Sequence, residues 1–147
     1  MPELWTFDEI VTPSQQQKIK VAHNELPEDC RSSPAAPDEL AAFEQKFGPI
    51  PQDYRWYLAN CGGGVIGSEW IDSIEDLPAT HRKVREAQRR GFYRVAHFFP
   101  LGWDGGGNPY GYDLDTGRIV TEDHDFGGIH EVAADFYDLV CSKGLVR

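Results

Sequence analysis

The segment from Phe47 to Gly64 constrains the fold most, because it predicts a short helix with a sharp stop at each end. Pro51 suits the first helical position, since its φ is already helical and its missing N–H would have no partner there. The apolar residues that follow share one helical stripe at i, i+3, i+4 and i+7: Tyr54, Tyr57, Leu58 and Cys61. Glycines 62–64 then end the helix, because glycine adopts the left-handed cap conformation. We expect this aromatic helix to lie at the centre of the core.

Further helices are predicted over residues 12–25, 37–47 and 78–90. The first begins at Thr12, where Gln15 can complete a capping box. Residues 26–37 contain three prolines and two serines and predict a surface linker. A last amphipathic helix is predicted over residues 129–140, from the apolar positions Ile129, Val132, Ala133, Phe136, Leu139 and Val140.

Strands are predicted over residues 65–66, 70–71, 92–99, 110–114 and 118–121. Residues 101–108 predict a glycine-rich loop, and Asp115-Thr116-Gly117 predicts a hairpin turn. Strands gathered between N-terminal and C-terminal helices indicate an α+β fold with a mainly antiparallel twisted sheet. We expect one domain over residues 1–147, with residues 1–36 as an N-terminal helical extension.

Composition places the chain among soluble proteins of a reducing compartment. A hydrophobic content of 40% is enough for a core, and no apolar run approaches the ~18 residues of a membrane span. The first residues lack a signal-peptide pattern. Three widely spaced cysteines predict neither a disulfide framework nor a zinc site. The chain is therefore expected to be cytoplasmic, away from membranes.

The net charge of −10 is unevenly distributed. Residues 101–138 hold nine acidic residues and one basic residue, Arg118, whereas residues 81–94 hold six basic residues and one acidic residue, Glu86. The acidic segment argues against nucleic acid as a partner, because phosphate binding needs positive charge. A basic protein would be steered towards it. The alternative, that the charge only makes the surface soluble, stays open.

No assembled catalytic or cofactor site is predicted. The glycine-rich loop lacks the Lys-Ser/Thr ending of a P-loop. Segments 113–115 and 123–125 begin like calcium loops, but neither has an acidic twelfth residue. His124 and His130 are six residues apart, without the spacing of a helical metal site. We expect no metal and no cofactor; an enzyme that uses His124 and His130 is the alternative from a different class.

A protein-binding surface is the remaining candidate. Trp70 and Trp103 flank glycine-rich turns and lie close to carboxylates in the sequence, as the hot spot for a basic partner requires. The candidate partner-binding residues are Glu69, Trp70, Asp72, Trp103, Asp104, Asp113, Asp123 and Asp125. The alternative, that both tryptophans only fill the core, is left open.

The central segment also resembles the SUKH superfamily, the Smi/Knr-like proteins. The resemblance rests on Ile50-Pro51, then Tyr54, then Tyr57-Leu58 and a glycine stop, preceded by Glu44, Phe47 and Gly48. It continues through residues 102–120 and the Ala133-x-x-Phe136 pattern, and covers the chain from about Asp38 onwards. Gly62 stands where the family usually has Asn; both residues accept a left-handed φ.

The resemblance implies the same α+β fold and a non-catalytic immunity protein of bacterial polymorphic toxin systems. Such a protein binds and neutralises a cognate toxin, which is expected to be basic because many of these toxins attack nucleic acids. The resemblance also covers regulatory adaptors that bind a cellular protein, and that is the alternative function. Whether the chain acts as a monomer or a homodimer is left open.

Overall fold

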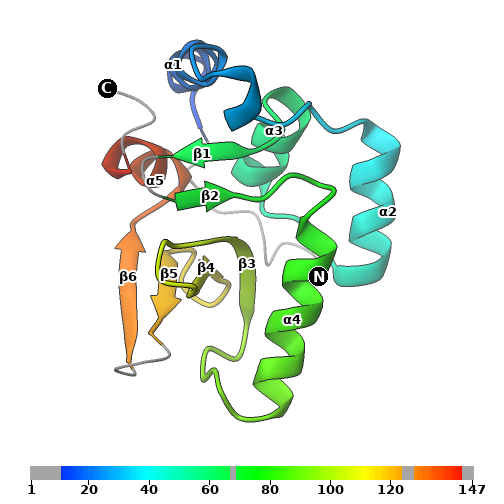
Figure 1. The fold of residues 1–147 in the computed structure, drawn as a ribbon, viewed down its shortest axis with the longest axis vertical. Coiled ribbons are helices and arrows are strands. Elements are labelled where there is room, and N and C mark those ends of the chain that lie inside the picture. The colour runs from blue at the N-terminus through cyan, green and yellow to red at the C-terminus, as the bar shows by residue number, and fades with distance from the viewer. Residues whose placement is uncertain (1–10, 67–68, 124–127, 144–147) are drawn as a thin grey trace.

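The structure is a computed structural model that describes residues 11–66, 69–123 and 128–143 (Figure 1). The described helices are α1 (Pro13–Asn24), the short 3-10 helix η2 (Glu28–Cys30), α2 (Pro37–Phe47), α3 (Gln52–Asn60), α4 (Leu77–Arg89) and α5 (Phe136–Ser142). The described strands are β1 (Gly64–Ile66), β2 (Glu69–Ile71), β3 (Phe98–Trp103), β4 (Pro109–Asp113), β5 (Ile119–Glu122) and β6 (Ile129–Ala133).

The strands form one antiparallel sheet in the order β1-β2-β3-β4-β5-β6. This confirms the predicted α+β class with an antiparallel sheet. Because successive strands reverse direction, the β1–β2, β3–β4 and β5–β6 connections leave one end of the sheet. The β2–β3 and β4–β5 connections leave the other end, and α4 lies within the β2–β3 connection.

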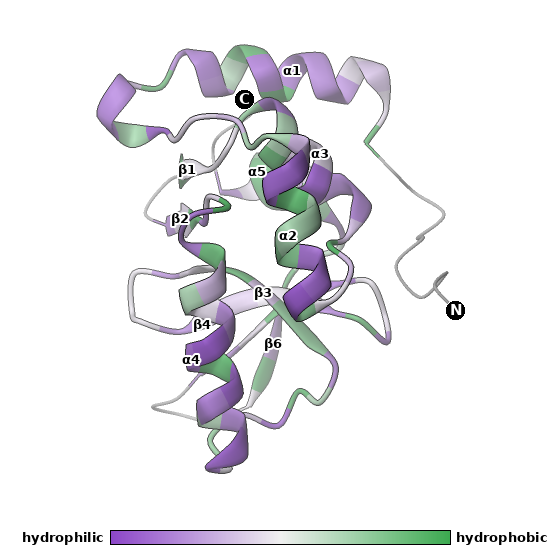
Figure 2. Cartoon of the chain, turned by 90° about the vertical axis from the view of Figure 1, so that its right-hand side faces the viewer, coloured by the Kyte–Doolittle hydropathy of each residue, from purple (hydrophilic) through white to green (hydrophobic). Residues whose placement is uncertain are grey.

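The helices surround one side and the top of the sheet in the view of Figure 1. There α4 runs along β3, and the two elements pack against each other. Helices α1, α3 and α5 gather around β1 and β2. Figure 2 shows that α4 is largely hydrophilic along its length, with hydrophobic residues at intervals. Its buried residues are Leu77, Thr80, His81 and Val84.

Helix α3 is the predicted centre of the core. The side chains of Tyr54, Tyr57 and Leu58 are completely buried. The Tyr54 hydroxyl donates a hydrogen bond of 2.7 Å to the backbone oxygen of Asp72, which ties α3 to the segment after β2. Both tyrosine rings also contact the ring of Phe136 at the start of α5. The predicted core helix is confirmed, with one difference: Pro51 is its N-cap, with an extended ψ of 139°, and Gln52 is the first helical residue.

Helix α1 contributes to the same core. Its predicted capping box is present: Gln15 N–H donates to Thr12 Oγ1 at 3.2 Å, and Thr12 N–H donates to Gln15 Oε1 at 3.0 Å. Ile19 is fully buried, and His23 Nδ1 lies 3.3 Å from the Tyr57 hydroxyl. Residues before the linker therefore pack on α3 directly.

The prediction of a strand over residues 92–99 and a loop from residue 101 is wrong. Strand β3 begins at Phe98 and continues to Trp103, with a bulge at Leu101. Gly102 permits this, because a Cβ there would lie 2.1 Å from the Trp70 backbone oxygen. The segment just before β3 is not a strand. It is held by the buried carboxylate of Glu122, which accepts a hydrogen bond from Arg94 N–H at 2.7 Å.

The predicted helix over residues 129–140 is also wrong in its first half. Residues 129–133 form β6, which pairs with β5. Helix α5 begins only after Asp135, whose side chain accepts the Asp138 N–H at 2.8 Å as an N-cap. The apolar positions therefore belong to a strand and a helix in succession, and their helical spacing across the boundary is coincidental.

Candidate functional site

Trp70 and Trp103 are directly opposite each other on β2 and β3. Opposite residues of an antiparallel pair present their side chains on the same face. Both tryptophans are half-buried, so each combines contact with the fold and exposure to solvent. We call Trp70, Trp103 and Asp104 the tryptophan surface.

The ring of Trp103 is held by a hydrogen-bond chain from α4. Its Nε1 donates to Thr80 Oγ1 at 2.9 Å, and the Thr80 hydroxyl donates to Asp72 Oδ2 at 2.5 Å. Asp72 is only 2% exposed, so its carboxylate is not available to a partner at the surface. Burial raises the pKa of Asp72 to about 7, although the Thr80 hydrogen bond opposes this shift. Asp72 therefore acts within the fold: through its hydrogen bond with Thr80 it helps to hold the Trp103 ring.

A cation lies over the ring of the same tryptophan. Lys83 Nζ, one turn further along α4, is 5.4 Å from the centroid of the Trp103 ring. This is within the range of a cation–π contact. Trp103 is therefore fixed both through its indole nitrogen and across its ring face.

Glu69 at the start of β2 forms an ion pair with the end of α5. Its Oε1 lies 2.9 Å from Lys143 Nζ, and its side chain is 11% exposed. The pair compensates the Glu69 charge locally. Glu69 thus joins β2 to the end of α5. Because Lys143 compensates its charge, Glu69 attracts a basic partner less strongly than the sequence predicts.

Asp104 organises the β3–β4 turn. Its carboxylate accepts Gly106 N–H at 2.9 Å, Asn108 N–H at 2.8 Å and Asn108 Nδ2 at 3.2 Å. These contacts shape the turn next to Trp103. Asp104 forms no salt bridge with a basic side chain among the described residues, and Lys83 is the cation placed against the neighbouring Trp103 ring.

The register separates the remaining predicted residues. Asp113 pairs with Phe98, at the opposite end of β3 from Trp103, and its carboxylate accepts the Asp115 N–H at 3.0 Å. Asp123 is half-buried and follows β5, at the sheet end where β3 finishes. Asp125 lies outside the described residues. The structure therefore brings together Trp70, Trp103 and Asp104, pairs Glu69 with Lys143 at the end of α5, and separates Asp113 from the tryptophans.

The alternative of a metal-dependent enzyme gains no support from the described part of the chain. There, no group of three or more His, Cys, Asp or Glu side chains is placed to hold a metal. His130 lies exposed on β6, and His124 lies outside the described residues. None of the described helices is both long and apolar enough to cross a bilayer.

Thr80 is the residue of the candidate site that the sequence did not reveal. It lies in the first turns of α4, where a threonine has no special signature. Its position in the site comes from its hydrogen bond to Trp103 of β3, which is 23 residues away in the chain. Only the packing of α4 along β3 identifies it.

Comparison with protein families agrees with this architecture. The model described as the SMI1 / KNR4 family (SUKH-1) matches residues 34–142. This span runs from just before α2 through the whole sheet to the end of α5. A search of curated proteins found no match. Since the family model covers well over half of the sequence, the chain belongs to the SMI1 / KNR4 family (SUKH-1).

Proposed function

We propose that this chain is a non-catalytic immunity protein that binds and neutralises a cognate bacterial toxin domain. Membership of the SUKH-1 family supports the proposal at the level of the fold. The observation that carries it is the Trp70–Trp103 pair beside Asp104, which has the composition of a protein-binding hot spot.

The geometry of Trp103 suits it to act as an anchor. Binding energy is lost when a mobile side chain must be ordered on association. The hydrogen bond to Thr80 and the Lys83 contact already hold this ring in the free protein. A partner that covers Trp103 would therefore gain apolar burial with little further loss of side-chain entropy.

The charge of the chain suits a basic partner. With a net charge of −10, it would attract a toxin that itself carries positive charge for binding nucleic acid. Asp104, which has no salt-bridge partner among the described residues, adds negative charge at the tryptophan surface, and Asp123 follows β5 at the same end of the sheet. Steering of this kind accelerates association and is screened by salt. Neutralisation then requires only that the toxin groove be covered.

Co-expression with the toxin domain encoded next to this gene tests the proposal. We expect the wild type to restore growth and to co-purify with the toxin domain. The double variant Trp70→Ala/Trp103→Ala should lose both properties. Trp56→Ala is the matched control, because Trp56 is also half-buried but lies on α3, with Lys20 6.0 Å from its ring centroid. Full protection by the double variant would exclude the tryptophan surface.

A further inference from the structure

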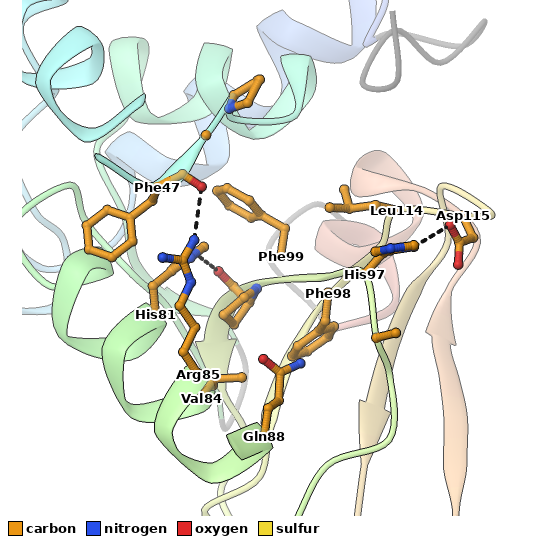
Figure 3. A pocket seen from close by; sticks show the side chains of 14 residues that line it. Phe47, His81, Val84, Arg85, Gln88, His97, Phe98, Phe99, Leu114 and Asp115 are labelled. Atoms are coloured by element: carbon orange, nitrogen blue, oxygen red, sulfur yellow. Dashed lines mark hydrogen bonds and ion pairs between the residues drawn. The ribbon is translucent and has the colours of Figure 1, made fainter. Parts of the chain in front are cut away.

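A hollow of about 340 Å³ lies between α4, the turn after α2 and β3 (Figure 3). Its apolar lining includes Val84 of α4, Phe98 and Phe99 of β3, and Leu114. Figure 3 shows Arg85 and Gln88 along the α4 side, with His97 and Asp115 on the opposite side. The volume and lining suit one large apolar side chain.

The polar groups around this hollow are held in place. Arg85 Nη2 donates to the Phe47 backbone oxygen at 3.1 Å, and Gln88 Nε2 donates to the Val95 backbone oxygen at 2.8 Å. Neither contact neutralises the Arg85 charge. The rim therefore has a fixed cation beside an apolar floor.

A second hollow continues from the first along α4. Its lining is Phe47, Arg82, Lys83, Arg85, Glu86, Gln88 and Arg89. Phe47, Arg85 and Gln88 line both hollows, so the two hollows adjoin along α4. We call their combined lining the α4 groove.

The charges of the α4 groove are not balanced. Its two carboxylates are both paired, Glu86 with Arg89 and Asp115 with His97. By contrast, no carboxylate in the described part of the chain lies within salt-bridge distance of Arg82, Lys83 or Arg85.

These three cations lie over aromatic rings instead. The Arg82 and Arg85 guanidinium carbons are 5.9 Å and 5.0 Å from the Phe47 ring centroid, and Lys83 lies over Trp103. Ring contacts do not use the N–H donors of these cations, so the donors other than Arg85 Nη2, which is bonded to the Phe47 backbone oxygen, can pair with an anion. The groove is therefore a local positive site on a chain whose net charge is −10.

We propose that the α4 groove binds an acidic peptide segment of a second partner protein. An aromatic or large aliphatic side chain of that segment fills the hollow above Phe98 and Phe99, and flanking carboxylates pair with Arg82 and Arg85. Charge complementarity favours this occupant over the basic toxin. A nucleic acid is a poorer occupant than an acidic peptide, because it would gain little from the apolar hollow and would be repelled by the acidic remainder of the chain.

A titration of the full, isotope-labelled chain monitored by two-dimensional amide NMR tests this site. The probe is the capped peptide Glu-Asp-Phe-Glu-Asp-Glu, with its Phe→Ala version and the basic peptide Lys-Arg-Phe-Lys-Arg-Lys as controls. At peptide concentrations up to about 2 mM, which detect weak binding, we expect saturable shifts at Val84, Gln88 and Phe98. The Phe→Ala peptide should bind at least fivefold more weakly, and the basic peptide should produce no shifts there.

The double variant Arg82→Gln/Arg85→Gln should weaken acidic-peptide binding at least fivefold. Arg90→Gln/Arg94→Gln is the matched control, because it removes the same charge outside the groove lining and should change the affinity less than twofold. Its amide spectrum and that of the groove variant also report whether each protein is folded.

Several outcomes would overturn the site. The acidic peptide could cause no shifts, or the Phe→Ala peptide could bind as tightly as the acidic peptide. An oligouridylate hexamer could also bind as tightly as the acidic peptide. Finally, shifts that depend on protein concentration in the absence of peptide would indicate self-association instead. The result is independent of the toxin proposal, since the groove variant should still protect cells in co-expression. Loss of peptide binding with full protection separates the two surfaces.

Discussion

The indole Nε1 of Trp103 donates a hydrogen bond to Thr80 Oγ1, 2.9 Å away. This contact joins the end of β3 to α4, and the Thr80 hydroxyl in turn donates a hydrogen bond to the buried Asp72 carboxylate. A half-exposed tryptophan is thereby positioned by a residue that no partner can touch. The properties of the proposed binding surface should therefore respond to substitutions beneath it.

Thr80→Val should destabilise the chain and release the Trp103 ring. The substitution leaves a buried carboxylate and an indole N–H without their partner, at a cost of about 1–3 kcal/mol. Urea unfolding and tryptophan fluorescence measure the two effects. Thr80→Ser keeps the hydroxyl and is the control. Equal stability of the Val and Ser variants would show that the hydrogen-bond chain contributes nothing.

Asp72 should make the free energy of unfolding fall as pH rises from about 4 to about 7. Burial raises its pKa to about 7, so the folded state holds a proton that the unfolded state has already released in this window. Asp72→Asn removes this pH-dependent contribution to the free energy of unfolding. Its stability relative to wild type should therefore increase between pH 5 and pH 8, by on the order of 2 kcal/mol.

His81 contributes in the opposite direction. Burial lowers its pKa to about 4, so the unfolded state takes up a proton first as pH falls below 6.5. The stability from neutral His81 is thus lost as pH falls towards 4. Because His81 is present in both proteins, its contribution cancels when wild type and Asp72→Asn are compared by urea unfolding. A difference that does not change with pH would contradict the assigned burial of Asp72.

Gly102→Ala should separate β2 from β3. The added Cβ would lie 2.1 Å from the Trp70 backbone oxygen, so we expect a loss of roughly 3 kcal/mol or more. Gly106→Ala is the control, because its Cβ would have only ordinary contacts at 3.5 Å and 3.6 Å, and its effect should stay within about 1 kcal/mol. Thermal or urea unfolding measures both. Similar stabilities would contradict the close approach of the two strands.

The sequence predicted those elements whose signals are local. Pro51 and the following glycines mark both ends of α3, and Thr12 with Gln15 marks the start of α1. It failed at residues 129–133, where pairing with β5 decides between strand and helix. Strand pairing is a tertiary contact, and the helical spacing of the apolar residues concealed it.

The candidate site was predictable in its residue types and less so in its geometry. Trp70 and Trp103 were named from their neighbours, but their position opposite each other depends on strand register. The same register places Asp113 at the far end of β3. The burial of Asp72 could not be read from the chain, because it depends on Thr80 and on the helix that carries it.

Neutral variants test the electrostatic part of the proposal. Glu69→Gln, Asp104→Asn, Asp113→Asn and Asp123→Asn remove four charges and keep an acceptor oxygen at each position. With the co-purifying toxin domain, the combined variant should associate more slowly and show a weaker salt dependence. Its matched control removes four exposed charges elsewhere, at Glu25, Glu28, Asp29 and Asp38. Equal effects of the two sets would indicate net charge alone.

The most direct measurement is hydrogen–deuterium exchange of the chain, free and bound to the toxin domain encoded beside it. We predict that binding protects amides of β2, the end of β3 and the turn at Asp104, around Trp70 and Trp103. Amides of α1, which carries none of the proposed binding residues, should be unchanged. Protection confined to α4, with β2 and the Asp104 turn unaffected, would contradict the proposed binding surface.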